Sequence, residues 1–413
     1  MVKIFDRNMY RCFALCVLIF ALLLLAPPVA HADGGAPNLA YVSGTSKGIS
    51  VIDISKQNVS KTINVAGDPH TIQLSLDGRF LYVTQPQLGR VSIIAAQTGD
   101  TVCSANVPGQ PTLLALDNTT GIIYAAGNGA STVSEIDPTN CTIKRTFQVS
   151  GPVYGLAVAT VASSSSGSGN QLWIAAGPAL TVLDDNSGQQ ISSVSISGSP
   201  RYITIPQGAT VYVTTQQGSV VAIDLSSHKV VPLISGSEYG PMDYDANTGE
   251  VYVPDLKNNR LDVLAPVNAG FAPPTEPSRT VSLGVRPESV AITSDGQLGF
   301  VALDGGNVAM LDITGRTIIN TFNVGGNPHF IITGLYPPVV GTTPQQANTL
   351  GTIFNIAAYI LVIALFLVPI LLFRKYARAR SAAGAGTQAA EGDGPSKESE
   401  AGVHSTGESE RKE

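Results

Sequence analysis

The chain has 413 residues, 44% of them hydrophobic and 13% charged, with a formal net charge of −6 at pH 7. Its central part, residues 33–349, is more acidic, with 14 Lys and Arg against 22 Asp and Glu, a difference of −8. This length allows a large buried core. An acidic body without a basic cluster excludes a nucleic-acid-binding protein.

Residues 1–32 have the pattern of a secretory signal peptide. Three basic residues are followed by an uncharged apolar run, 12–26, and the sequence "AHA" at 30–32 has the small residues that signal peptidase reads. A retained membrane anchor is the alternative, but the run is short for a span and Pro27-Pro28 interrupts it. We therefore expect cleavage before Asp33 and export of the body.

The body repeats one unit seven times. An aromatic residue in a β-rich run recurs every 39 to 49 positions, at Tyr41, Tyr82, Tyr124, Trp173, Tyr212, Tyr252 and Phe300. In five units the following strand ends in an aspartate, at Asp53, Asp137, Asp184, Asp224 and Asp312. A proline then leads a short apolar strand, at Pro69, Pro111, Pro152, Pro200, Pro241, Pro287 and Pro328. Each unit therefore predicts four short strands and no helix.

This repeat predicts an all-β fold, a seven-bladed β-propeller over residues 33–336. A four-stranded sheet of this size would leave both faces exposed, so the units must pack on one another around a central channel. The first unit lacks a proline-led strand, and the last such strand, which follows Pro328, has no successor. We therefore expect the C-terminal strand to pair with the N-terminal three strands and close the ring.

Three stretches carry a resemblance to a known family: "RFLYVTQ", "TVYVTTQQGSVVAIDLSSHKVV" and "GGNPH". They resemble the YVTN-repeat β-propeller family, over nearly all of 38–335. The resemblance implies a seven-bladed propeller of the kind found in exported and surface-layer-like proteins. In architecture it is also similar to the lactonase propellers.

The C-terminal part predicts a membrane tether. A proline-bearing stalk, 337–349, leads into an uncharged apolar run, 350–373, that is long enough to cross a bilayer. Four basic residues follow at once, which predicts by the positive-inside rule a single-pass protein with a cytoplasmic C-terminus. The tail 374–413 begins basic, becomes acidic, and is expected to be disordered and cytoplasmic.

Ligand candidates come from the residue after each proline, because that end of the innermost strand lies at the channel mouth. The charged and imidazole residues among these are His70, Arg201, Glu288 and His329. Ring closure would make the two histidines neighbours. With Glu288 they form the two-histidine, one-carboxylate set that suits a divalent metal. The alternative is that the two histidines are only part of the repeated Gly-x-Pro-His sequence and bind no metal.

Two other groups of residues have structural interpretations. Each aspartate that ends a third strand is expected to bond backbone N–H groups of the following turn. Cys103 and Cys141 are the cysteines that remain after signal removal, and they can pair in an oxidising compartment, although their spacing does not decide whether they do.

These patterns favour a membrane-anchored binding or surface-interaction module that acts outside the cytoplasm as a monomeric propeller. We expect a protein or glycan partner and no cofactor, with one divalent metal as the alternative. Two other functions stay open: a lactonase-like or metal-dependent enzyme at the channel mouth, and a structural envelope protein that assembles laterally.

Overall fold

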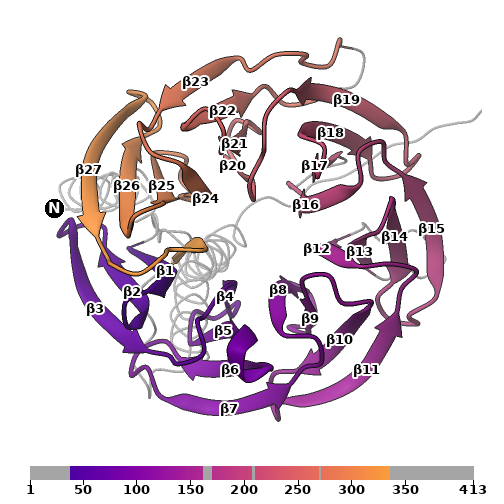
Figure 1. Cartoon of the computed structure of the whole chain (residues 1–413), viewed down its shortest axis with the longest axis horizontal. Coiled ribbons are helices and arrows are strands. Elements are labelled where there is room, and N and C mark those ends of the chain that lie inside the picture. Colours follow the sequence, from indigo (N-terminus) through magenta and orange to yellow (C-terminus); the bar gives the residue numbers. More distant parts are fainter. Residues whose placement is uncertain (1–37, 161–169, 207–209, 269–270, 335–413) are drawn as a thin grey trace, which may run out of the picture. The chain divides into compact units, whose positions relative to one another are not determined.

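A computed structural model describes residues 38–160, 170–206, 210–268 and 271–334, which all belong to one compact unit. They form seven four-stranded antiparallel sheets arranged in a ring, the blades of a β-propeller (Figure 1). Within these ranges the one helix is a short 3-10 turn, η1 (Pro86–Leu88). We number the blades 1 to 7 from the N-terminus, so the sheet that contains β1, β2 and β3 is blade 1.

In each blade the four strands lie side by side, in order from the innermost strand at the channel to the outer strand at the rim. From blade 1 to blade 7, the innermost strands are β28 (Ile331–Gly334), β4 (Ile72–Leu74), β8 (Pro111–Leu116), β12 (Val153–Ala159), β16 (Pro200–Thr204), β20 (Asp243–Tyr244) and β24 (Pro287–Ile292). The second strands are β1 (Leu39–Thr45), β5 (Phe80–Gln85), β9 (Ile123–Gly127), β13 (Gln171–Ala176), β17 (Thr210–Thr215), β21 (Val251–Asp255) and β25 (Leu298–Leu303). The third strands are β2 (Gly48–Asp53), β6 (Arg90–Ala95), β10 (Thr132–Asp137), β14 (Ala179–Asp184), β18 (Ser219–Asp224), β22 (Arg260–Leu264) and β26 (Asn307–Asp312). The outer strands are β3 (Asn58–Asn64), β7 (Thr101–Asn106), β11 (Thr142–Gln148), β15 (Gln190–Ser195), β19 (Val230–Ser235), β23 (Arg279–Ser282) and β27 (Thr317–Asn323).

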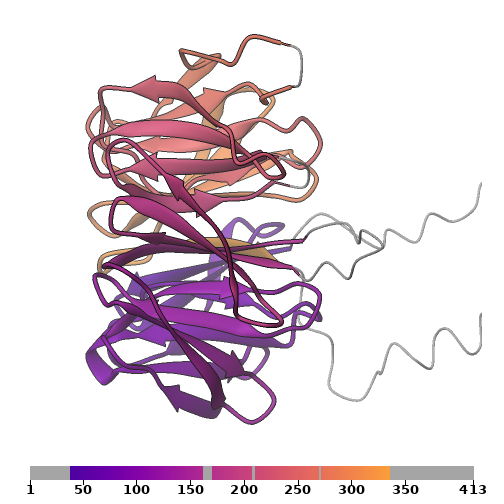
Figure 2. The same cartoon turned by 90° about the vertical axis from the view of Figure 1, so that its right-hand side faces the viewer.

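Burial along the strands follows from the packing of blade on blade. Strands in the middle of a blade are buried on both faces, so β13 is apolar at nearly every position. The outer strand β3 instead alternates exposed and partly buried residues, because one of its faces meets solvent. The side view in Figure 2 shows that the sheets extend through the thickness of the ring.

The repeated aromatic residues fill the spaces between neighbouring blades. Tyr41, Tyr124, Trp173, Tyr252 and Phe300 are among the largest fully buried side chains. Tyr124 of blade 3, for example, shares a core cluster with Leu172 and Ile174 of blade 4. These large apolar rings therefore supply much of the surface that holds one blade to the next.

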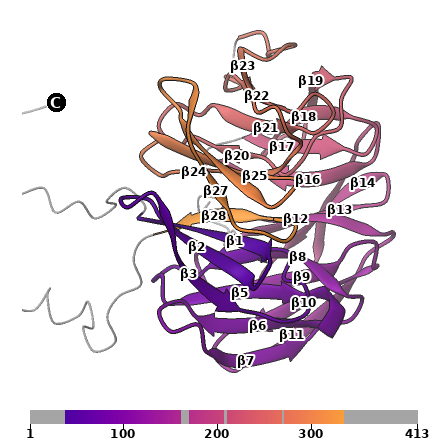
Figure 3. The same ribbon diagram turned by 60° about the vertical axis from the view of Figure 1, so that its left-hand side comes forward.

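Ring closure occurs as the sequence predicts. Strand β28, from the end of the described chain, pairs antiparallel with β1, and Leu39 lies opposite Gly334 while Val42 lies opposite Ile331. Figure 3 shows β28 alongside β1. Blade 1 is therefore built from both ends of the propeller, which removes the open sheet edge that an unclosed ring would present.

Several segments predicted from the sequence lie outside the described residues: the signal peptide 1–32, the stalk 337–349, the span 350–373 and the tail 374–413. They stay predictions. Within the described ranges, no helix is both long enough and apolar enough to cross a membrane.

Candidate functional site

The channel mouth is formed where the innermost strands begin. Strands β8, β16 and β24 start with the repeated proline, a residue that fits the first position of a strand because it lacks an N–H group. The next residue in each blade stands at this end of the channel. In order around the ring from blade 2, these residues are His70, Thr112, Val153, Arg201, Met242, Glu288 and His329.

The structure brings the two histidines together at the junction of blades 1 and 2. The imidazole rings of His70 and His329 are stacked, with centroids 4.8 Å apart and planes inclined by 15°. Backbone bonds fix both residues, since the His329 N–H donates to the Ser43 carbonyl and the His70 N–H donates to the Thr84 carbonyl. The Ser43 hydroxyl also donates to the His70 carbonyl and so joins the two blades.

One carboxylate accompanies this imidazole pair. The Nε2 atom of His329 lies 3.2 Å from Oδ1 of Asp68, in the connection that precedes β4. Burial lowers the pKa of His70 to about 4, and the nearby His329 adds to that effect, whereas Asp68 opposes it. His70 is therefore uncharged at neutral pH.

Glu288 and Arg201 belong to a separate row of alternating charges. The Nη1 atom of Arg201 lies 3.7 Å from Oε1 of Glu238, and the Arg286 guanidinium lies 3.3 Å from the same oxygen. Arg286 also contacts Glu288, with Nε 3.2 Å from Oε1. We call these four residues, Arg201, Glu238, Arg286 and Glu288, the charged arc. Burial raises the pKa of Glu288, while Arg286 opposes that rise.

The charged arc includes Glu288, one of the three residues predicted to hold a metal together with His70 and His329. The Glu288 carboxylate is already engaged by Arg286. Among the described residues, no three His, Cys, Asp or Glu side chains are grouped so that they can hold a metal ion. A bound metal at the imidazole pair stays a prediction from the sequence, which elemental analysis of the full chain would test.

A cavity of about 600 Å³ lies behind the mouth, and the innermost strands of all seven blades contribute to its wall. His70 and Met242 line the end of the cavity nearer the mouth, Asn118, Ala246 and Ser294 line its other end, and most of the remaining wall is apolar. The repeat pattern alone does not predict this cavity. A signal was present in the sequence, because three of the seven innermost strands place a small alanine opposite the repeated aromatic residue of the second strand, at Ala115, Ala157 and Ala291.

The aspartates that end third strands bond the turns that follow them. One carboxylate oxygen accepts a backbone N–H in each case, as at Asp53 from Lys56, Asp137 from Thr139, Asp184 from Ser187, Asp224 from Ser227, and Asp312 from Gly315. These bonds lower the pKa of Asp224 to about 2, with the Ser227 N–H as the largest cause. Such carboxylates stabilise turns on the face opposite the mouth.

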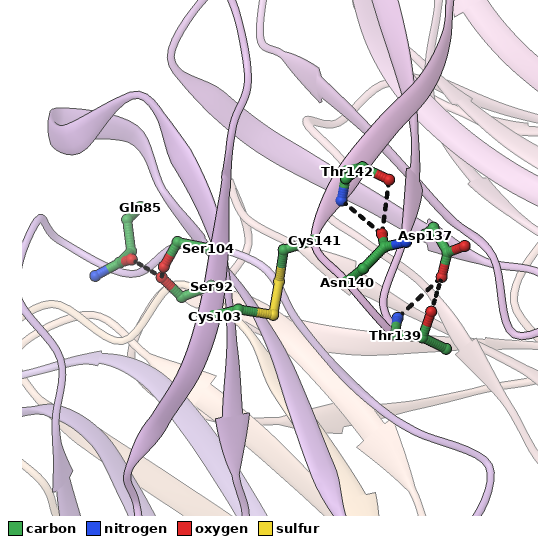
Figure 4. The surroundings of a disulfide bond; sticks show 9 residues. All are labelled: Gln85, Ser92, Cys103, Ser104, Asp137, Thr139, Asn140, Cys141 and Thr142. Carbon is green, nitrogen blue, oxygen red and sulfur yellow. Dashed lines mark hydrogen bonds between the residues drawn. A yellow bond between two sulfur atoms is a disulfide. The ribbon is translucent and has the colours of Figure 1, made fainter.

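Cys103 and Cys141 form a disulfide with an S–S distance of 2.00 Å and a Cα–Cα distance of 6.0 Å. Cys103 lies on β7, the outer strand of blade 2, and Cys141 lies in the turn before β11 of blade 3. Figure 4 shows the bond beside the Asp137 turn. It is therefore a covalent link between the outer parts of two adjacent blades.

No protein-family model matches this chain, and no curated protein sequence matches it. Solved structures do match its fold. Hydrazine synthase of Kuenenia stuttgartiensis is 18% identical and aligns with a TM-score of 0.51 over 62% of this chain and 80% of its own. The dihydro-heme d1 dehydrogenase NirN is 13% identical, with a TM-score of 0.53 over 71% of this chain and 74% of its own. The β-propeller domain of Cps50 (Swd1) of Myceliophteria thermophila is 14% identical, with a TM-score of 0.56 over 68% of this chain and 93% of its own. At this identity the likeness shows the fold alone, and the protein is a seven-bladed β-propeller.

Proposed function

We propose that this chain is an exported propeller, tethered to a membrane by residues 350–373, whose mouth face binds a protein or glycan outside the cytoplasm. The signal-like segment, the apolar run and the basic residues after it support the topology. The repeat sequences support membership of the YVTN-repeat type. We infer that the propeller acts as a monomer and requires no cofactor for binding.

The charged arc is the observation that carries this proposal. Its two guanidinium groups are held by Glu238 and Glu288, yet the side chains of Arg201 and Arg286 remain 31% and 39% exposed. An arginine that is fixed in place and still accessible can donate further hydrogen bonds to a partner at little entropic cost. Because the arc alternates in sign, it suits a partner with mixed polar groups better than a strongly charged polymer.

A charge-matched pair of variants tests the proposal. We expect Arg201→Ala with Arg286→Ala to weaken binding of the full chain to envelope protein or glycan fractions from its source cells at least about tenfold. The control, Arg79→Ala with Lys144→Ala, removes the same charge away from the mouth, in the turn before β5 and on the outer strand β11, and should leave binding unchanged. Biolayer interferometry would measure both. Equal binding by the mouth variant and the unmodified chain, or no binding by the unmodified chain, would refute the proposal.

A further inference from the structure

At one level of the ring, several short side chains line the cavity in the channel. At this level, each innermost strand places one residue opposite the repeated aromatic of the second strand. These seven residues are Gln73, Ala115, Ala157, Thr204, Asp243, Ala291 and Ile332, and all of them line the cavity. Three alanines and a threonine leave room here for a small molecule, and a volume of about 600 Å³ is in the range of ligand sites.

Asp243 is the one acidic residue among the described residues that line this cavity, and that lining includes no lysine or arginine. Its Oδ2 atom accepts the N–H of Ile292 from blade 7 at 2.7 Å. The one histidine among the described residues of this lining, His70, is uncharged at neutral pH because burial lowers its pKa to about 4. The wall of the cavity therefore carries one negative charge when Asp243 is ionised.

The wall of the cavity that contains this carboxylate is largely apolar and includes three aromatic rings. Tyr202, Tyr244 and Phe330 line the same cavity as Asp243, together with leucine, isoleucine and valine side chains. Burial raises the pKa of Asp243 to about 6, and the N–H groups of Ile292 and Tyr244 oppose that rise. No charged side chain of the described residues contributes to this shift. An ionised carboxylate in such a place lacks a neighbouring cation, which is unfavourable unless a ligand supplies one.

We propose that the channel binds a small organic cation, an ammonium group on an apolar body, with the ammonium at the Asp243 carboxylate. The aromatic rings favour such a ligand, because a ring face attracts a positive charge. One face of Tyr202 is already covered by the Arg201 guanidinium, 4.7 Å from the ring centre, which leaves the Asp243 carboxylate as the main source of the preference for a cation. This site lies inside the channel and goes beyond the partner surface proposed for the mouth face.

Three probes of one shape test the inference by isothermal titration calorimetry on the full chain at neutral pH: 2-phenylethylammonium, the neutral 2-phenylethanol and the anionic 3-phenylpropionate. We expect the cation to bind at least about tenfold more tightly than the alcohol, and the anion most weakly. The variant Asp243→Asn keeps an oxygen for the Ile292 N–H and should bind cation and alcohol equally. The control Glu288→Gln removes a carboxylate outside the cavity lining and should keep the preference.

A second measurement needs no variant and so does not depend on its folding. Because the pKa of Asp243 is about 6, the unmodified chain should bind the cation about tenfold more weakly at pH 5 than at pH 8. Equal affinity for cation and alcohol, or for the cation at both pH values, would overturn the inference. The double variant Arg201→Ala, Arg286→Ala should still bind the cation, so failure of the mouth-face proposal and failure of this one give different results.

Discussion

At the scale of single residues, an acid pair joins blades 3 and 4 on the face opposite the mouth. Asp117 follows β8 and is fully buried, and Asp185 follows β14 with 7% exposure. The Asp185 carboxyl donates a hydrogen bond to the Asp117 carboxylate, which also accepts from the Thr119 N–H and the Asn170 amide. Burial, with this pairing, raises the pKa of Asp185 to about 7, so the folded chain holds a proton there that the unfolded chain releases near pH 4.

This pair predicts a pH dependence of stability. Because the folded state binds the extra proton, Asp185 stabilises the fold. Its contribution to the free energy of unfolding is fully present below about pH 4 and is lost as the pH rises to about 7. Asp185→Asn keeps a hydrogen-bond donor and lacks the titration. Between pH 5 and pH 8 we expect the unmodified chain to lose about 2–3 kcal/mol of unfolding free energy that Asp185→Asn does not lose, as measured by urea unfolding.

A third-strand aspartate of another blade gives the control for that measurement. Asp224 accepts N–H groups of its turn, which lower its pKa to about 2, below the pH range of the experiment. Asp224→Asn should therefore shift stability by the same amount at pH 5 and pH 8. If Asp185→Asn behaves in the same way as Asp224→Asn, the proton shared by Asp185 and Asp117 is refuted.

At the scale of elements, strand β28 decides whether the ring is closed. Ile331, the first residue of this strand, is 1% exposed and lies in a core cluster with Val42 of blade 1 and Phe300 of blade 7. It therefore contributes to the contact between the first blade and the last. Its hydrogen-bonded partner strand, β1, comes from the opposite end of the described chain.

The substitution Ile331→Ala tests that role. Removing a buried isoleucine side chain from a packed core is expected to cost about 2–4 kcal/mol of unfolding free energy. Ile318→Ala, in the outer strand β27 where the side chain is 41% exposed, makes the same chemical change and should cost well under about 1 kcal/mol. Urea unfolding followed by tryptophan fluorescence measures both, and similar losses in the two variants would argue against a packed closure.

Part of this architecture can be predicted from the sequence alone. The spacing of the aromatic residues and prolines predicts the seven blades, the four strands of each, and the closure that stacks His70 on His329. It does not predict the charged arc, because Glu238 and Arg286 lie in connections between blades whose paths depend on three-dimensional packing. The sequence does not single out Asp243 for another reason. The proline pattern selects Met242, the residue before it. The place of Asp243 in the cavity appears only from its pairing with Tyr252 in the structure.

At the scale of the whole molecule, the disulfide between Cys103 and Cys141 links two blades across 38 positions of sequence. Closing a loop of this length restricts the unfolded chain, and typical disulfides of this kind contribute about 2–4 kcal/mol. We expect the variant Cys103→Ala, Cys141→Ala to unfold at a correspondingly lower urea concentration. A reducing agent should lower the urea midpoint of unfolding of the unmodified chain and leave that of the variant unchanged. If the reducing agent lowered both midpoints equally, the disulfide would not be the cause of the loss.

We expect the mouth face, rather than the opposite face, to meet a partner outside the cytoplasm. Photo-cross-linking in intact source cells tests it, with the reactive group placed on the full chain at Lys257, an exposed residue between β21 and β22 on the mouth face. The matched position is Thr119, an exposed residue in the β8–β9 hairpin on the other face. We expect a discrete adduct at position 257 that is absent at 119 and is lost when Arg201 and Arg286 are replaced by alanine. Equal adducts at both positions, or none at 257, would contradict it.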